Sequence, residues 1–210
     1  MLIYVSGKYS GDVDANIEAA ASIAGDLWEM GHAVFCPHTN TANFEKRCAA
    51  TYEQYIAGDL EVITWCGALV MVPGWEESKG AVIEKDYAES LGIPIYYAPD
   101  YPPLHPTEIN YPEQAKAFRE ILGQMYRTHL KKNADYSPNN ITLTGDIGVV
   151  TRLWDKMARL LTLHGLKFTV AQGTWGAVDD PKNEPVEDSF LDMAVHAIIG
   201  LILRRGHWGR

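Results

Sequence analysis

The chain has 210 residues, of which 47% are hydrophobic and 21% are charged, and its formal net charge is −9. These values are typical of a soluble globular protein with enough chain for one large domain or two small ones. The acidic balance and the lack of a basic stripe argue against a nucleic-acid polymer as partner, whereas a small anionic ligand needs only a few local donors.

The sequence also indicates a compartment. No apolar run has membrane-spanning length and no charged-then-apolar leader begins the chain, so we expect no membrane partner. Three cysteines have neither paired nor zinc-type spacing: Cys36, Cys48 and Cys66. We interpret them as reduced thiols, which favours a cytoplasmic protein.

In the first half of the chain, short apolar runs alternate with helical patterns. The apolar runs are residues 2–6, 32–36, 67–73 and 93–97, and the helical patterns lie near residues 13–30, 50–64 and 80–92. This alternation predicts an α/β domain over residues 1–98, in which helices flank a parallel sheet. Gly31 and Gly92 are placed to end the helices that precede two of the strands.

The pattern changes after a segment with five prolines, residues 98–112, of which we assign 99–112 to a linker. The long helical periods that follow are residues 113–133, 146–164 and 185–204, with no convincing strand between them. We therefore expect an all-helical domain over residues 113–210, with a long loop at 169–185.

The loop after the first predicted strand is a candidate binding site. Ligands of open parallel sheets bind at the carboxyl ends of the strands, and this loop reads "SGKYSG". Its glycines, Gly7 and Gly11, let backbone N–H groups approach an anion, and the next helix adds its positive end. A glycine-containing turn without a ligand is the alternative, because short glycine patterns are common.

Two carboxylates fall within apolar stripes of predicted helices. Asp59 shares its stripe with Tyr52, Ile56 and Ile63, and Glu84 shares its stripe with Ala81, Ala88 and Leu91. An unpaired carboxylate buried against a sheet is costly, so each should have a partner or a purpose. A structural hydrogen bond to a tyrosine or a helix cap is the alternative for either residue alone; two such carboxylates in one domain favour a site.

Roughly residues 1–98, which include both carboxylates, resemble a known superfamily. The segments "IYVSGKYSG" and "SKGAVIE" and the Asp59 helix resemble the nucleoside 2-deoxyribosyltransferase superfamily, particularly its 2′-deoxynucleoside 5′-phosphate N-hydrolase branch. The resemblance implies a flavodoxin/Rossmann-like fold, no cofactor, and a deoxynucleoside or deoxynucleotide as substrate. It implies Glu84 as nucleophile on the anomeric carbon, Asp59 handling the proton at the leaving base, and Tyr4 positioning Glu84. It assigns Ser78 to the 5′ end of the substrate, and the other implied substrate-binding residues are Gly7, Lys8, Ser10, Gly11 and Gly80.

The chemistry of N-glycosidic cleavage suits this pair of carboxylates. Breaking the bond develops oxocarbenium character, which an adjacent carboxylate can stabilise or capture covalently. A second carboxyl group in partly apolar surroundings has a raised pKa and can protonate the departing base.

A second resemblance covers about residues 105–204. The segments "HLKKNADYSPNN", "RLWDKMARL" and "EPVEDSFLDMAVHAIIGLI" resemble the all-helical nucleotide-modification-associated domains of phages, which are similar to MazG-type nucleoside triphosphate pyrophosphatases. A phage-encoded protein would work in the cytoplasm of a bacterial host. The resemblance implies that carboxylates bind Mg²⁺ and that basic side chains bind the phosphates of the substrate. The candidate metal ligands are Asp155, Glu187, Asp188 and Asp192, and the candidate phosphate-binding residues are Arg152, Lys156 and Arg159.

Helical periodicity predicts that these carboxylates differ in burial. Asp155, Asp188 and Asp192 lie off the apolar arcs of their helices, and for Asp155 a solvated, salt-bridged face is the alternative to a metal site. Glu187 lies inside its arc, so we expect it to be buried and to need a cation or a donor. Polar arcs in a short bundle also suggest completion by a second copy, so we expect a homo-oligomer.

The resemblances together suggest a nucleotide-metabolism enzyme. Its α/β half would cleave or transfer at the N-glycosidic bond, and its helical half would hydrolyse dNTPs to dNMPs. One alternative is a non-catalytic nucleotide sensor or assembly module that uses Glu84 and Asp59 only to bind. Another is a pyrophosphatase that is active only in the helical half.

Overall fold

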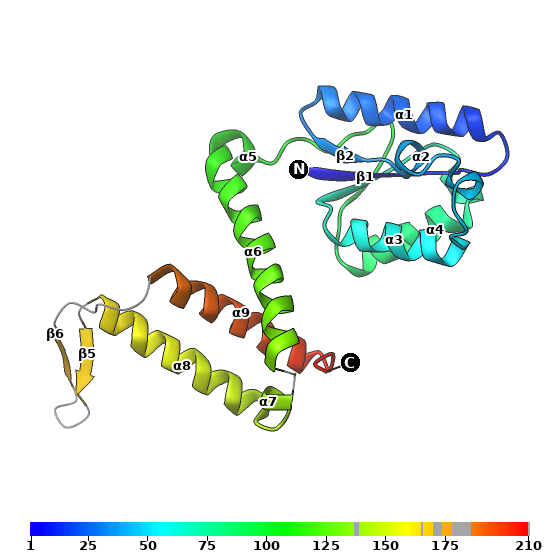
Figure 1. Ribbon diagram of the computed structural model, residues 1–210. Helices are drawn as coiled ribbons and strands as arrows, with labels where there is room; N and C mark the ends of the chain where they lie inside the picture. The colour runs from blue at the N-terminus through cyan, green and yellow to red at the C-terminus, as the bar shows by residue number, and fades with distance from the viewer. Residues whose placement is uncertain (137–138, 165, 170–173, 178–185, 210) are drawn as a thin grey trace. The chain divides into compact units, whose positions relative to one another are not determined.

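The computed structural model describes residues 1–136, 139–164, 166–169, 174–177 and 186–209 (Figure 1). The chain forms two compact units, Met1–Ala115 and Lys116–Arg210. The first is an α/β unit and the second is mainly helical, which confirms the expected fold class. No helix among the described residues is long and apolar enough to cross a membrane.

The α/β unit is built on a four-stranded parallel sheet. Its strands are β1 (Leu2–Ser6), β2 (Ala33–Phe35), β3 (Ala68–Met71) and β4 (Ile95–Tyr97), in the order β2-β1-β3-β4. The central strand β1 pairs with both neighbours, so that Tyr4 stands opposite Phe35 on one side and Leu69 on the other. Strand β3 likewise pairs with β1 and β4, so β1 and β3 are the two inner strands of the sheet.

Helices cover both faces of this sheet. Helix α1 (Val13–Glu29) lies on one face, and α3 (Tyr52–Thr64) and α4 (Lys79–Ser90) lie on the other (Figure 1). Successive residues of a strand point to opposite faces. Ile3 and Val5 accordingly pack in the core beneath α1, and Tyr4 packs in the core beneath α3 and α4.

Local sequence signals set the ends of these helices. Asp12 caps α1, Thr51 and Gln54 form a capping box at the start of α3, and Ser78 caps α4 by accepting from Ala81 N. The residues predicted to follow α1 and α4 as caps both have positive φ, 87° for Gly31 and 71° for Gly92. Shorter elements lie between the main ones: α2 (Pro37–Asn40) and the 3₁₀ helices η1 (Phe44–Lys46) and η2 (Trp75–Glu77).

The proline-rich segment predicted as a linker packs on the α/β unit. His32 Nε2 donates to the Pro102 carbonyl at 3.0 Å, and the Tyr101 hydroxyl donates to Asp26 at 2.9 Å. The segment includes a short helix, α5 (Pro106–Asn110). The boundary between the two units lies after Ala115, within the first residues of α6 (Pro112–Tyr136).

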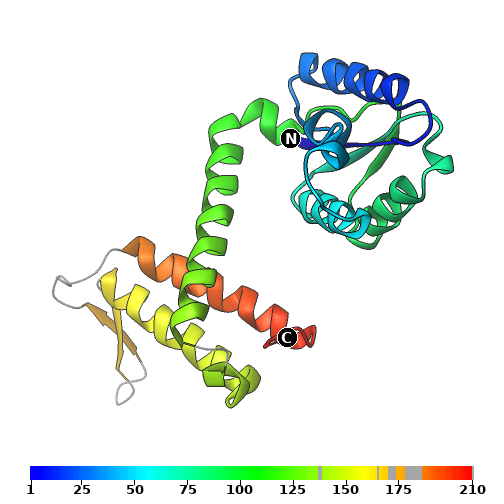
Figure 2. The same cartoon turned by 45° about the vertical axis from the view of Figure 1, so that its right-hand side comes forward.

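The second unit is organised around two long helices. Helices α8 (Gly145–Leu163) and α9 (Val186–Arg204) lie side by side in both views (Figures 1 and 2). Its buried core comes from α6, the short helix α7 (Asn139–Thr142), α8 and α9, through Met125, Ile141, Val149, Val195 and Ile199.

One expectation for this half was wrong. We expected no strand, but β5 (Leu166–Thr169) and β6 (Thr174–Ala177) form an antiparallel hairpin between α8 and α9. Strand β6 falls within the segment expected to be a loop, while residues 170–173 and 178–185 lie outside the described residues.

Gly7 lies where the backbone after β1 meets the end of β3. A Cβ atom on Gly7 would lie 2.7 Å from Cβ of the buried Val72. We predict that Gly7→Ala lowers the free energy of unfolding by about 1–3 kcal/mol, because a well-packed backbone must shift. Gly25→Ala is the control, since its Cβ meets nothing within 4 Å and alanine should stabilise α1 by roughly 0.5–1 kcal/mol. Urea unfolding checks both, and equal effects from the two substitutions would contradict the close approach at Gly7.

Candidate active site

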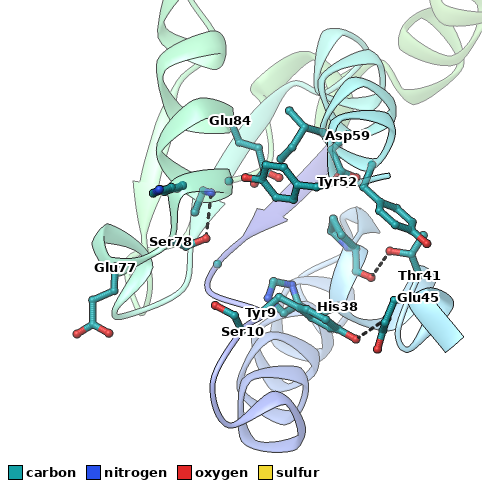
Figure 3. Close-up of a pocket in the computed structure, with 17 residues that line it drawn as sticks. Tyr9, Ser10, His38, Thr41, Glu45, Tyr52, Asp59, Glu77, Ser78 and Glu84 are labelled. Atoms are coloured by element: carbon teal, nitrogen blue, oxygen red, sulfur yellow. Dashed lines mark hydrogen bonds between the residues drawn. The ribbon is translucent and has the colours of Figure 1, made fainter. Parts of the chain in front are cut away.

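A pocket of about 520 Å³ opens beside the carboxyl ends of β1 and β3 in the α/β unit (Figure 3). Its walls come from the loop after β1, from α2 and η1, from α3, and from the start of α4. This is the edge of the sheet at which the sequence predicted a ligand.

Glu84 forms part of the inner wall of the pocket. Its side chain is 6% exposed and projects from the second turn of α4. The Tyr4 hydroxyl donates to Glu84 Oε1 at 3.0 Å, and Ser6 Oγ donates to Oε2 at 2.5 Å. Tyr4 and Ser6 are two residues apart on β1, so both hydroxyls point to the face that α4 covers. The carboxylate is thus held by two neutral donors.

Asp59 lies beside Glu84 in the pocket (Figure 3). It projects from α3 and is half-buried. The Tyr4 hydroxyl interacts with Asp59 as well as with Glu84. The structure therefore brings the three residues expected to be catalytic into one cluster, with Tyr4 behind the carboxylates.

Burial changes the protonation of this cluster. It raises the pKa of Glu84 to about 7; the nearby Asp59 carboxylate adds to the rise, and the hydrogen bonds from Ser6 and Tyr4 oppose it. It also raises the pKa of Asp59 to about 6, against the hydrogen bond from Tyr4. Burial and the two carboxylates raise the pKa of Tyr4 as well, so Tyr4 stays a protonated donor. Between these two pKa values the carboxyl groups hold about one proton between them, and Glu84, which has the higher pKa, holds the larger share.

The predicted substrate-binding residues divide into two groups. Those that line the pocket are Gly7, Ser10, Ser78 and Gly80. Lys8 and Gly11 do not line it: Lys8 Nζ pairs with Glu77 Oε2 at 2.5 Å, and Gly11 makes the turn with a φ of 94°. At Gly80 a Cβ atom would lie 3.3 Å from the Tyr52 hydroxyl, so a glycine there lets α3 and α4 approach at the pocket mouth.

Several residues of the site were not predicted from the sequence. Ser6 ends β1, and His38 follows β2, so the rule about strand ends would have found both. His38 is 4% exposed and Nε2 donates to the Lys8 carbonyl at 3.1 Å, which leaves Nδ1 as an acceptor without a partner in the described chain. Burial lowers the pKa of His38, so the ring is neutral. Other unpredicted side chains that line the pocket are Tyr9, Thr41, Glu45, Tyr52, Tyr55 and Glu77.

In the helical unit, Asp192 lies between two lysines. Lys132 Nζ donates to Oδ1, and Lys156 Nζ lies 2.7 Å from Oδ2. Burial alone would raise the pKa of Asp192, but hydrogen bonds and charges from Lys132 and Lys156 outweigh it and lower the pKa. Four of the predicted residues line a cavity of about 340 Å³: Arg152, Asp155, Lys156 and Asp192. Arg159, Glu187 and Asp188 do not line it.

The carboxylates of the helical unit do not match the expected Mg²⁺ site. Both oxygens of Asp192 are taken by lysines, and the side chains of Asp155 and Asp188 are exposed. Glu187 was expected to be buried, but it is exposed, because it lies one turn before Leu191, the first α9 residue of the core. Among the described residues, no group of three or more His, Cys, Asp or Glu side chains is placed to hold a metal ion. This donor set does not fit Mg²⁺, which needs several oxygen ligands.

The apolar side chains of α8 are only partly buried. Val149 and Leu160 are in the interior, whereas Val150 and Trp154 are each 63% exposed. The homo-oligomer expected from this half of the chain stays a prediction.

The comparisons with known proteins concern the half of the chain that contains the pocket. Residues 1–97 match the family model described as Domain of unknown function (DUF4406). That range includes every pocket-lining residue, from Gly7 to Glu84. The chain matches no curated protein and no solved structure. Fold and site together define an α/β domain with paired carboxylates at the carboxyl edge of a parallel sheet.

The raised pKa of Glu84 predicts a pH-dependent stability effect. A carboxyl group whose pKa rises on folding, here from 4.5 to about 7, stabilises the fold at low pH and loses that contribution as pH rises through 7. Glu84→Gln should therefore raise the free energy of unfolding at pH 8, by about 1–3 kcal/mol, and much less at pH 5.

Urea unfolding of the full chain at pH 5 and pH 8 measures this difference. Glu76→Gln is the control, because Glu76 is exposed and outside the pocket. A gain in Glu84→Gln that is the same at both pH values would show that Glu84 is not buried as a carboxylate.

Proposed function

We propose that the α/β unit cleaves or transfers at the N-glycosidic bond of 2′-deoxynucleosides or their 5′-monophosphates. The observation that carries the proposal is the buried Glu84 carboxylate, held on both oxygens by Tyr4 and Ser6 in the wall of a pocket, with Asp59 beside it. Two carboxyl groups in one pocket supply the nucleophile and the acid that glycosidic cleavage requires. The segments that resemble the deoxyribosyltransferase superfamily supply the parts of this pocket from β1 and its loop, from α3 and from the start of α4.

Glu84 serves as the nucleophile. As the bond to the base breaks, its electron pair leaves with the base nitrogen and the anomeric carbon becomes electron-poor. An oxygen of Glu84 bonds to that carbon and forms a glycosyl ester. The hydrogen bonds from Tyr4 and Ser6 fix the orientation of the carboxylate before the substrate arrives, which lowers the entropic part of the barrier.

Asp59 supplies the proton that the departing base needs. The reactive form of the pair has Glu84 ionised and Asp59 protonated, so that the proton passes from Asp59 to the base. The Asp59 carboxylate then takes a proton from the incoming water or acceptor base, whose attack on the anomeric carbon releases Glu84. Burial raises the pKa of Asp59 to about 6, so that a fraction of Asp59 stays protonated near neutral pH. Because the pKa of Glu84 is higher, about 7, the form with the proton on Asp59 is the minor one of the two singly protonated forms.

The rest of the pocket suits a nucleoside in size and character. Its volume, about 520 Å³, is within the usual range of about 300–1,000 Å³ for small-molecule sites. Tyr9, Tyr52 and Tyr55 line it and offer aromatic surface for a base.

The direct test is base release. The protein is incubated with the four 2′-deoxynucleosides and with their 5′-monophosphates, and free base is measured by chromatography. We expect release by the parent protein and a loss of at least about 10³-fold in Glu84→Ala, which removes the nucleophile. Ligand-induced shifts in melting temperature without base release would favour a non-catalytic sensor and contradict the proposal.

The role of Asp59 predicts a dependence on the leaving group. Asp59→Asn removes the acid, so release of poorly departing bases should slow by about 10²–10⁴-fold, and release of activated bases much less. Rates for a series of bases with different nitrogen pKa values measure this trend. Equal slowing for every base would assign Asp59 to substrate positioning.

Hydrolysis of dNTPs to dNMPs and pyrophosphate by the helical unit stays a prediction from the resemblance of that half. We derive no catalytic step for it, because the described carboxylates of that unit do not assemble a set of oxygen ligands.

A further inference from the structure

The charges that line the pocket are mostly negative. Its described lining contains one ammonium group and four carboxylates, which belong to Lys79 and to Glu45, Asp59, Glu77 and Glu84. His38 adds no positive charge, because burial lowers the pKa of its ring. The carboxylate of Glu77 is paired with Lys8, which lies outside the lining. With Asp59 protonated and Glu84 ionised, the charges that remain are the cation of Lys79 and the carboxylates of Glu45 and Glu84. An anionic ligand therefore meets net repulsion in this pocket.

The two ends of the pocket differ in chemistry. Asp59 and Tyr52 lie on one side of Glu84, and Ser78 and Glu77 lie on the other (Figure 3). If the proposed function holds, the base departs on the side of Asp59, which protonates it. The 5′ end of the sugar then extends away from α3, toward Ser78 and the start of α4.

This end of the pocket includes Lys79, the cation of the lining, and Glu77, which is already paired with a second cation, Lys8. Lys8 Nζ and Glu77 Oε2 are 2.5 Å apart, and their side chains are 32% and 70% exposed. An exposed ion pair of this kind adds little to stability, but it decides which charges a ligand meets. A 5′-phosphate must compete with Glu77 for Lys8 and lie close to a like charge. A 5′-hydroxyl carries no charge and can donate to the same carboxylate.

We infer that the pocket selects the uncharged 2′-deoxynucleoside over its 5′-monophosphate, and that Glu77 sets this selectivity by engaging Lys8 and adding a negative charge at the 5′ end. This inference rests on the proposed function, whose substrate class it narrows. Glu77 acts on specificity and takes no part in breaking the bond. Because both partners are exposed, the selectivity weakens as salt rises, with a Debye length of about 10 Å at 0.1 M.

The test compares kcat/KM for one 2′-deoxynucleoside and its 5′-monophosphate at low salt. The parent protein should prefer the nucleoside by about tenfold or more, which is the scale of one unfavourable charge contact. Glu77→Gln should reduce this ratio by about five- to tenfold, since it frees Lys8 and removes the charge. Glu76→Gln, which removes an exposed carboxylate one residue away and outside the pocket, should leave the ratio unchanged. The double variant Lys8→Met/Glu77→Gln should lose part of the gain for the monophosphate.

Each outcome decides between the proposals. A parent protein that prefers the monophosphate, or an equal change of ratio in Glu76→Gln, would overturn the inference. Titration calorimetry of Glu84→Gln, which lacks the nucleophile, with the same two ligands measures the preference without turnover. Tighter nucleoside binding with no base release would support the selectivity and overturn the proposed function, while base release with a monophosphate preference would overturn the selectivity alone. Binding of neither ligand would overturn both.

Discussion

Burial of the Glu84 carboxylate against the central strand is the constraint on which the rest of the α/β unit depends. A carboxylate removed from water must be compensated, and here Tyr4 and Ser6 donate to its two oxygens. Both donors must stand on the same face of β1, which the spacing of two residues along the strand provides. Helix α4 must come close to the sheet for those bonds to form, and Ala81 and Ala88, both buried beside Glu84, leave room for that approach.

The same constraint links the fold to its chemistry. Compensation by hydroxyls leaves the negative charge of Glu84 unneutralised, so burial raises its pKa and keeps the group reactive toward an electron-poor carbon. Asp192 in the helical unit shows the opposite arrangement. Two lysines neutralise it and its pKa falls, which is typical of a structural ion pair. The partners of each carboxylate thus distinguish Glu84, a candidate nucleophile with hydroxyl donors, from Asp192, a structural residue paired with lysines.

Local patterns predicted much of the fold and the centre of the site. Strand runs, capping residues and C-terminal glycines are short-range signals, so the main elements of the α/β unit and the caps at Gly31 and Gly92 agree with the structure. Glu84 and Asp59 could be identified because a carboxylate within an apolar stripe is a local anomaly. Ser6 and His38 lie where the rule about strand ends directs attention, but a serine at a strand end and a histidine after a proline are ordinary in sequence and do not stand out as a carboxylate in an apolar stripe does. Their roles depend on which strands become neighbours. The predicted burial of Glu187 was wrong for a related reason. Periodicity indicates which face of a helix points inward, but it does not indicate how far along the helix the neighbouring elements cover that face.

The central claim is that Glu84 forms a covalent bond to the sugar. The most direct measurement is mass spectrometry of the acid-quenched protein during turnover of a 2′-deoxynucleoside with an activated base. In Asp59→Asn, loss of the group that assists the second step should let the glycosyl ester accumulate. The account predicts a deoxyribosyl adduct on the peptide that contains Glu84. Release of base while that peptide stays unmodified at every time point would contradict it.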